Sequence, residues 1–275
     1  MDPRENPFAP GAGSPPPELA GRDPILERIA IALDRIRAGR HAKSVLLVGL
    51  RGVGKTVLLN RVALDAEARQ IICPSVETPE DRSLPSLLVP ALRHALTRLD
   101  RAEAAKGHAR RAWRALSGFV RSAKIKYQDV EFHLDVEPEP GFADTGNLDV
   151  DLSDLFGAVG RAAKERDMAV AIFIDELQYV QEDQLAALIT ALHRCQQTQL
   201  PVTVVGAGLP QLVGNTGKAK TYAERLFDFP EIGRLDRDSA TRAVEAPLAR
   251  QSVSIEPPAL DEILIRTHGY PYFLQ

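Results

Sequence analysis

The chain has 275 residues, enough for one large domain or two modest ones, and it carries a net charge of −3 with a pI of about 6.1. This balance excludes a protein that is basic throughout, so a nucleic acid or an anionic membrane would have to be met by a local patch. The apolar runs are too short to cross a bilayer and the first residues do not resemble a signal peptide, so we expect a cytoplasmic protein with no membrane partner.

The first twenty residues hold six prolines, a composition that favours neither a strand nor a helix. We expect residues 1–20 to form an N-terminal arm. A helix is then predicted with Asp23 as its N-cap, Pro24 as its first residue and Gly39 at its end. Its buried stripe is predicted to consist of Ile25, Ile29, Leu33 and Ile36.

Short apolar runs of strand length recur along the chain at 44–48, 70–76, 169–174 and 201–206. Helical spacing of apolar residues follows the first run from Lys55, and a helix is predicted at about 183–198 between the last two. Strands that alternate with helices indicate a parallel α/β sheet.

Between the second and third runs lie nearly a hundred residues, more than one crossover helix requires. They include a long helical region at about 84–122 and an alternating segment at 124–137 that is typical of an exposed strand or hairpin. After residue 234 the pattern is helical, with Asp238 as the expected cap and a second short helix in 257–269. We therefore expect a domain at 21–233 with an insertion at about 77–155, and a small, incomplete helical lid at 234–275.

The segment "GLRGVGKT" fits the phosphate-loop pattern GxxxxGK[ST] and lies between a predicted strand and a predicted helix. Loop N–H groups and the helix N-terminus would face phosphate oxygens, Lys55 would reach the β- and γ-phosphates, and Thr56 would offer its hydroxyl to Mg²⁺. A glycine turn with a solvated lysine is the alternative. The predicted nucleotide-binding residues are Gly49, Arg51, Gly52, Val53, Gly54, Lys55, Thr56 and Val57.

The apolar run "AIFIDE" ends with two adjacent carboxylates, Asp175 and Glu176, which are costly to place there unless a cation is near. We expect Asp175 and Thr56 to hold Mg²⁺, and Glu176 to polarise a water molecule for attack on the γ-phosphate. A helix-capping role for Asp175 and a solvated surface position for Glu176 are the alternatives.

Together, "GLRGVGKT", "IFIDE" and the upstream "ELAGRD" resemble the AAA+ and STAND branch of P-loop ATPases, close to Orc1/Cdc6-like proteins of bacteria and archaea. The resemblance implies a three-layer α/β sandwich with a mainly parallel five-stranded sheet and a helical lid, ATP and Mg²⁺ as ligands, and hydrolysis to ADP and phosphate. It also implies that Arg22 and Pro271 border the nucleotide. Arg225 lies where such proteins present an arginine finger to a neighbouring subunit of a homo-oligomer, although a plain surface arginine is at least as good an interpretation.

Two departures from the resemblance predict slow turnover. The strand after the acidic pair ends in Gly206, Ala207 and Gly208, where a polar sensor residue is usual, and the terminal "GYPYFLQ" contains no arginine. We therefore expect an ATP-driven conformational switch rather than a motor.

The insertion is divided by charge: residues 98–126 contain nine Lys or Arg against two acids, and residues 128–154 contain nine acids and no Lys or Arg. The basic half could bind a nucleic-acid backbone through Arg110, Arg114 and Arg121, with Trp113, Leu116 and Val120 packed behind. That would make the protein a DNA-associated loader or transposition-helper ATPase. For the basic half, neutralisation by the acidic half and contact with another protein are the alternatives. For the protein as a whole, a P-loop kinase activity with a separate acceptor is a third hypothesis.

Overall fold

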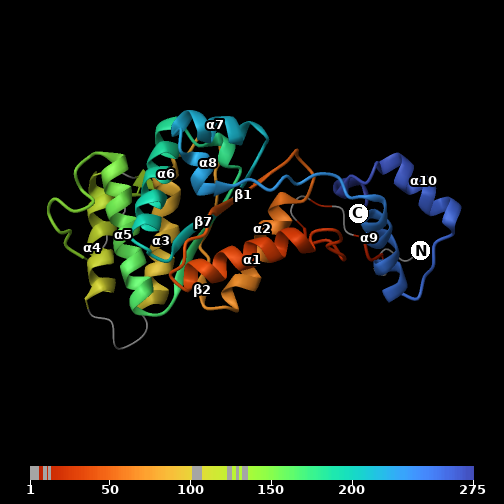
Figure 1. Cartoon of the computed structure of the whole chain (residues 1–275), viewed down its shortest axis with the longest axis horizontal. Helices are drawn as coiled ribbons and strands as arrows, with labels where there is room; N and C mark the ends of the chain where they lie inside the picture. Colours follow the sequence, from red (N-terminus) through yellow and green to blue (C-terminus); the bar gives the residue numbers. More distant parts are fainter. Residues whose placement is uncertain are drawn as a thin grey trace.

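The computed structural model describes residues 6–8, 11, 14–100, 107–122, 126–127, 130–131 and 136–275. A parallel sheet forms the centre of the larger lobe, in the order β2/β3, β6, β7, β1, β8 (Figure 1). Its strands are β1 (Ser44–Val48), β2 (Ile71–Ile72), β3 (Ser75–Glu77), β6 (Ala169–Asp175), β7 (Val202–Gly208) and β8 (Phe227–Asp228). The predicted parallel α/β fold is confirmed.

The sheet has six strands rather than five because the run at 70–76 is broken at Pro74. Proline has no N–H to donate to a neighbouring strand, so pairing cannot continue through it. Its carbonyl still accepts from the N–H of Phe173 at 2.8 Å. β2 and β3 therefore lie one after the other along the same edge of β6 and occupy one position in the sheet.

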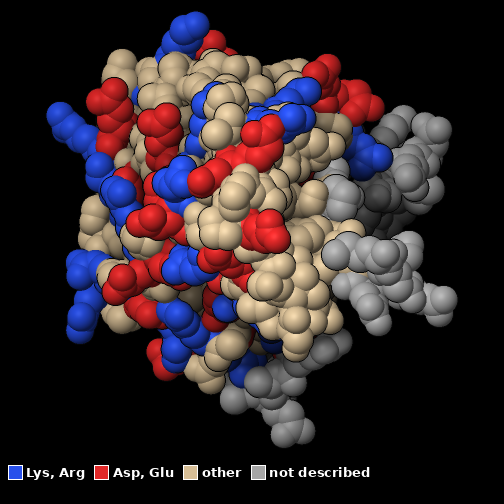
Figure 2. All heavy atoms as spheres, turned by 90° about the vertical axis from the view of Figure 1, so that its right-hand side faces the viewer, with Lys and Arg blue, Asp and Glu red and all other residues tan. Residues whose placement is uncertain are grey.

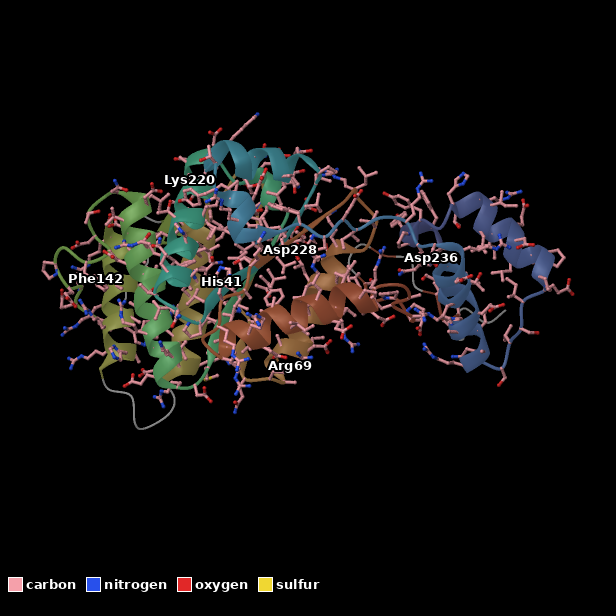
Figure 3. The ribbon with its side chains drawn as sticks, in the orientation of Figure 1. His41, Arg69, Phe142, Lys220, Asp228 and Asp236 are labelled. Carbon is pink, nitrogen blue, oxygen red and sulfur yellow. The ribbon has the colours of Figure 1, made fainter. Side chains whose placement is uncertain are left out.

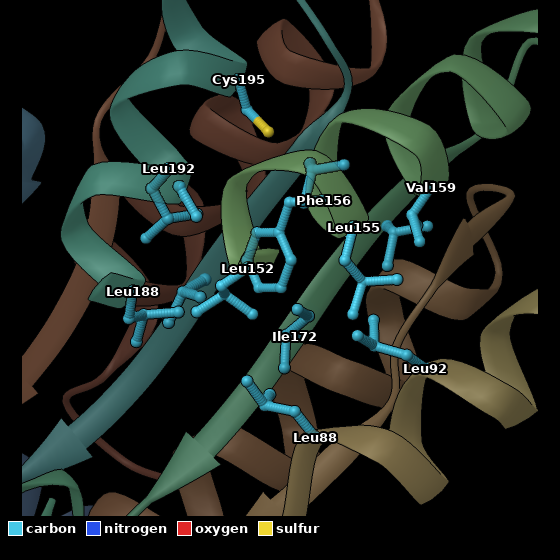
Figure 4. Packing of buried hydrophobic residues seen from close by; sticks show 14 of the residues in the cluster. Leu88, Leu92, Leu152, Leu155, Phe156, Val159, Ile172, Leu188, Leu192 and Cys195 are labelled. Atoms are coloured by element: carbon cyan, nitrogen blue, oxygen red, sulfur yellow. The ribbon is translucent and has the colours of Figure 1, made fainter. Parts of the chain in front are cut away.

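Helices cover both faces of the sheet (Figure 1). α1 (Asp23–Arg37) and α2 (Lys55–Glu67) pack on one face, where alternate strand residues such as Val45 and Phe173 point. The other side is occupied by α3 (Leu84–Asp100), α5 (Leu148–Glu165), α6 (Glu182–Gln197), α7 (Gln211–Ala219) and α8 (Ala223–Leu226). α4 (His108–Ser122) packs against α3 and α5. Figure 4 shows α3, α5 and α6 meeting over β6 through Leu92, Phe156, Leu188 and the buried Cys195.

A smaller helical lobe stands apart from the sheet and has its own apolar cluster. It contains α9 (Arg237–Arg250), α10 (Pro257–Thr267) and a 3₁₀ turn at Pro271–Phe273, and we call it the lid. Asp236 lies where the chain passes from the sheet to the lid (Figure 3). The lid cluster contains Ala240, Val244, Leu248, Leu260, Leu264 and Leu274.

Two helix starts differ from the predicted ones. Asp23 is the first residue of α1 and Arg22 occupies the N-cap position, so the predicted aspartate cap is shifted by one residue. In α9 the cap is Asp236, whose side chain accepts from the N–H of Ser239 at 2.7 Å, and Asp238 is already helical. A capping residue needs an extended backbone, and Asp236 has one with φ −64° and ψ 169°.

The predicted helical region at 84–122 contains α3 and α4, and residues 101–106 lie outside the described part of the chain. Within 124–137, β4 (Lys126–Tyr127) and β5 (Val130–Glu131) form an antiparallel pair, as expected of a hairpin; residues 123–125, 128–129 and 132–135 lie outside the described part. The chain's described helices include none that is both apolar enough and long enough to span a bilayer.

Candidate active site

The loop at 49–56, which we call the P-loop, connects β1 to α2 and requires glycine at three positions. Gly52 and Gly54 have φ of +76° and +92°, in the region that side chains disfavour. At Gly49 a Cβ would lie 2.2 Å from the carbonyl oxygen of Ile232. No side chain caps the first turn of α2, so its N–H groups face the loop without a side-chain acceptor. This is the arrangement that binds phosphate.

Lys55 is the first residue of α2 and its side chain folds back over the P-loop. The Nζ atom donates to the carbonyl oxygens of Gly49 at 2.9 Å and Leu50 at 2.8 Å. Burial lowers the pKa of the ammonium, while the negative charges of Glu176 and Asp175 raise it. The cation is therefore held by weak neutral acceptors that an anionic ligand can replace.

Thr56 and Asp175 meet although 119 residues separate them: the Thr56 hydroxyl donates to Asp175 Oδ2 at 2.6 Å. Asp175 ends β6 and is buried, which raises the pKa of its carboxyl; the bonds from Thr56 and from the N–H of Glu176 lower that pKa in part. A hydroxyl and a carboxylate oxygen are ligands of the type Mg²⁺ prefers. The described residues contain no group of three or more His, Cys, Asp or Glu side chains that could hold a metal ion.

Glu176 has a left-handed backbone with φ +56° and ψ +37°, which is uncommon for a residue other than glycine. The Thr78 hydroxyl, just beyond β3, donates to the carbonyl oxygens of Asp175 at 2.8 Å and Glu176 at 2.7 Å. The Gln178 side-chain amide donates to Glu176 Oε2. The sequence interpretation missed Thr78 and Gln178, and their only signal was that polar residues follow apolar ones at the ends of strands.

A pocket that is open to solvent adjoins the P-loop on the lid side. Of the residues predicted to bind nucleotide, Arg22, Val53, Gly54, Val57 and Pro271 line it. Leu19 and Ala20, from the same "ELAGRD" segment as Arg22, also line it. The sequence did not reveal its other walls, which come from the arm at Phe8, Pro16, Pro17 and Glu18 and from the lid at Leu235, Ala243, Leu274 and Gln275.

Arg22 is buried at the junction of this pocket with the P-loop. Its guanidinium donates to the carbonyl oxygens of Val53 at 3.2 Å and Gly233 at 2.6 Å. Burial lowers the pKa of Arg22, and the charge of Asp236 raises it. Arg22 thus connects the P-loop to the segment that leads into the lid.

The lid also contacts the tip of the P-loop directly. The Tyr270 hydroxyl donates to the carbonyl oxygen of Arg51, and the Tyr272 N–H donates to that of Gly52 at 3.2 Å. The Arg51 guanidinium donates to the Tyr179 hydroxyl at 2.7 Å, so it points toward the turn that follows Glu176. Any movement of the loop tip therefore changes contacts with the lid.

Arg225 lies apart from this group. It is exposed on α8, and no contact among the described residues brings it to the P-loop of its own chain.

The basic helix α4 is neutralised in part by the acidic segment that follows it. Arg111 pairs with Glu139 at 3.1 Å and Arg121 with Glu137 at 3.5 Å. Arg111 also lies 4.6 Å from the ring centre of Phe142, at the outer edge of the helical layer (Figure 3). Arg110, Arg121 and Arg111 are exposed, whereas Arg114 is half-buried. At the lid end of the molecule, Figure 2 shows basic and acidic side chains interspersed.

Three solved structures share this fold over most of the chain. Cdc6p from Pyrobaculum aerophilum has a TM-score of 0.51 at 16% identity and covers 86% of this chain and 51% of its own. AMPPCP-bound DnaA from Aquifex aeolicus has a TM-score of 0.51 at 12% identity, and the match covers 92% of this chain and 59% of the DnaA chain. A single-substitution variant of RuvB from Thermotoga maritima has a TM-score of 0.50 at 17% identity, and the match covers 93% of this chain and 59% of the RuvB chain. The chain thus spans about half to three fifths of the length of these proteins.

No curated protein matches the chain. The sequence profile of the AAA ATPase domain matches residues 18–205, which include the P-loop, Asp175 and Glu176. This match covers more than half of the 275 residues. The chain therefore belongs to the AAA ATPase domain family.

Proposed function

We propose that the protein binds Mg²⁺·ATP between the sheet and the lid, hydrolyses it slowly to ADP and phosphate, and works as a conformational switch. The observation that carries this proposal is the 2.6 Å bond between Thr56 and Asp175, with Lys55 and Glu176 beside it, at the carboxyl ends of β1 and β6. In open parallel sheets, ligands bind at this edge.

The pocket between the arm, the P-loop and the lid is mostly apolar and would take the base and ribose, with Arg22 and Pro271 at its wall. The P-loop amides and the N-terminus of α2 would bind the triphosphate. Lys55 would exchange its two carbonyl acceptors for phosphate oxygens, which form stronger, charge-assisted bonds.

Thr56 and Asp175 would hold Mg²⁺ through one hydroxyl and one carboxylate oxygen. When bound, the ion would neutralise charge on the β- and γ-phosphate oxygens. The buried Asp175 carboxylate is costly in the absence of a cation, which supports this assignment.

Glu176 would act as the general base. It would accept a proton from a water molecule whose oxygen forms a bond to the γ-phosphorus, while the bond from that phosphorus to the β–γ bridging oxygen breaks. The products are ADP and inorganic phosphate, and the proton passes from Glu176 to solvent.

The switch would consist of the sheet domain, at 21–233 with its insertion at about 77–155, and the lid at 234–275. Tyr270, Tyr272 and Arg22 bond to carbonyl oxygens of the P-loop tip. Nucleotide that moves this tip would change those bonds, and only contacts that differ between two states can shift their populations. A homo-oligomer is part of the proposal: the exposed Arg225 would be offered to the nucleotide of a second copy.

Phosphate release in the absence of any acceptor tests the proposal, with Glu176→Gln against Glu182→Gln as the matched control. Glu182 is an exposed glutamate in the first turn of α6. We expect Glu176→Gln to bind ATP as the wild type does and to lose about 10²- to 10⁴-fold in turnover, with the control unchanged. Equal turnover in Glu176→Gln and wild type would reject the base, and phosphate transfer that requires an acceptor would indicate a kinase.

A further inference from the structure

β7 ends without a polar side chain, and a glutamine from another element occupies the space. Gly206, Ala207 and Gly208 close the strand, so this end of β7 has no polar side chain that could orient a water molecule or a carboxylate. Gln178, from the 3₁₀ turn at Leu177–Tyr179 after β6, is buried beside the end of β7.

Both ends of the Gln178 amide have defined partners. Its Nε2 donates to Glu176 Oε2, and its Oε1 accepts from the N–H of Leu209, directly after β7, at 3.0 Å. Among the described residues, Gln178 provides the only side-chain hydrogen bond to the Glu176 carboxylate. This leaves Oε1 of Glu176 without a side-chain partner in the described part of the chain.

Glycine at 208 provides the room that Gln178 uses. A Cβ at that position would lie 2.9 Å from Gln178 Oε1 and 2.8 Å from Leu212 Cδ2. Contacts this short are not tolerated without a shift of one partner, and Gln178 is held at both ends. The missing side chain of β7 and the presence of Gln178 are therefore two parts of one arrangement.

We propose that Gln178 is a positioning residue: it orients the Glu176 carboxylate so that Oε1 faces the attacking water, and it links that carboxylate to the end of β7 and to α7. This rests on the proposed function of Glu176 as the base. Thr78 fixes the backbone of Glu176 but not its side-chain torsions. A fixed carboxylate loses less freedom in the transition state than a mobile one.

The variant Gln178→Glu separates this role from a structural one. It has the same size and keeps an oxygen that accepts from the Leu209 N–H, but it replaces the neutral amide donor to Glu176 with a second carboxyl group, which either repels the Glu176 carboxylate or shares one proton with it. Gln178→Met removes both bonds at similar volume. The matched control is Gln184→Met, because Gln184 is a buried glutamine of α6 that accepts from the N–H of Leu84 at 2.7 Å and does not touch Glu176.

Each variant is measured in full-length protein for melting temperature, for affinity for a non-hydrolysable ATP analogue with Mg²⁺, and for kcat and KM of phosphate release. We expect Gln178→Glu and Gln178→Met to lower kcat about 10- to 100-fold, with analogue affinity within about twofold of wild type. Gln184→Met should keep the wild-type kcat. In a Glu176→Gln background, Gln178→Glu should lower kcat no further, because the two residues act as one unit.

Four results would overturn the inference: an unchanged kcat in Gln178→Glu, an equal loss in Gln184→Met, a loss of analogue affinity that accounts for the lower rate, or additive losses in the double variant. An inactive wild type would instead reject the proposed hydrolysis and the role of Gln178 with it. If Gln178→Met fails to fold, Gln178→Glu still decides, because it retains the bond to Leu209.

Discussion

The Thr56 hydroxyl donates to the Asp175 carboxylate at 2.6 Å, so the two residues proposed to share one ion are already paired without it. The pairing leaves a buried negative charge in the ligand-free protein, and burial raises the pKa of Asp175. The ion proposed for this site would neutralise that charge, which lowers stability as long as it is uncompensated.

Asp175→Asn is expected to stabilise the ligand-free protein and to abolish its response to Mg²⁺·ATP. An acid whose folded pKa is raised binds its proton more tightly in the folded state. In the wild type this makes the free energy of unfolding fall as pH rises from about 4, the ordinary aspartate pKa, to the raised value, and remain lower above it. Urea unfolding from pH 4 to 8 should show a shallower fall in Asp175→Asn, and equal curves would contradict this.

Lys55→Ala is expected to remove measurable ATP binding. The change deletes the ammonium group that donates to the carbonyl oxygens of Gly49 and Leu50 in the P-loop. Titration of a fluorescent ATP analogue measures the effect, and phosphate release should fall with binding. Lys164→Ala is the control, because Lys164 is exposed near the end of α5. Binding by Lys55→Ala at the wild-type affinity would reject the site.

Tyr270→Phe is expected to speed release of ADP about 2- to 10-fold, which is the effect expected from the loss of one hydrogen bond between the lid and the P-loop. The change removes the bond from the lid to the Arg51 carbonyl oxygen and leaves the ring in place. Stopped-flow displacement of labelled ADP gives the rate. Tyr272→Phe is the control because Tyr272 contacts the loop through its backbone N–H, and an equal effect in both variants would exclude the hydroxyl.

Arg225→Ala is expected to lower turnover by about 10³-fold or more if the arginine acts on a second copy's nucleotide. Specific activity of the wild type should then rise with protein concentration. A mixture of Arg225→Ala with Lys55→Ala should regain activity, since each supplies what the other lacks. Arg61→Ala, an exposed arginine of α2, is the control. If turnover does not depend on protein concentration and Arg225→Ala loses none of it, Arg225 has no role in hydrolysis.

DNA is expected to bind weakly or not at all, because Glu137 and Glu139 already pair with Arg121 and Arg111. Fluorescence anisotropy with a labelled duplex at about 50 mM salt tests this. An affinity that falls steeply with salt and is lost in Arg110→Glu/Arg114→Glu would instead establish the loader or transposition-helper alternative.

The sequence predicted the features that depend on local pattern. The P-loop, α2 and β6 follow from apolar spacing and a motif whose chemistry requires Thr56 and Asp175 to meet. The division of the run at 70–76 into two strands at Pro74 could also have been predicted, because proline has no N–H to donate to a neighbouring strand. The N-cap of α1 lies one residue before the predicted Asp23, and the N-cap of α9 lies two residues before the predicted Asp238. Both differ because a cap depends on backbone torsions that residue type alone does not set.

The rest depends on contacts between distant segments. Gln178 acquires its partners only when β7 ends beside the turn after β6, and Gly208 matters through the space it leaves. The pocket beside the P-loop likewise forms only when the arm and the lid meet there. The division of charge in the insertion predicted pairing between its basic and acidic halves as one of several outcomes. The ion pairs that Arg111 and Arg121 form with the acidic half agree with this outcome.

The walls of the pocket beside the P-loop come from described residues between Phe8 and Val57 and from others between Leu235 and Gln275. During synthesis the P-loop therefore leaves the ribosome long before the segment that completes its enclosure. At about 5 to 20 residues per second, roughly 10 to 45 s separate Thr56 from Leu274 on a nascent chain. Over that interval a nucleotide bound as proposed would meet the P-loop but only one side of the pocket for its base.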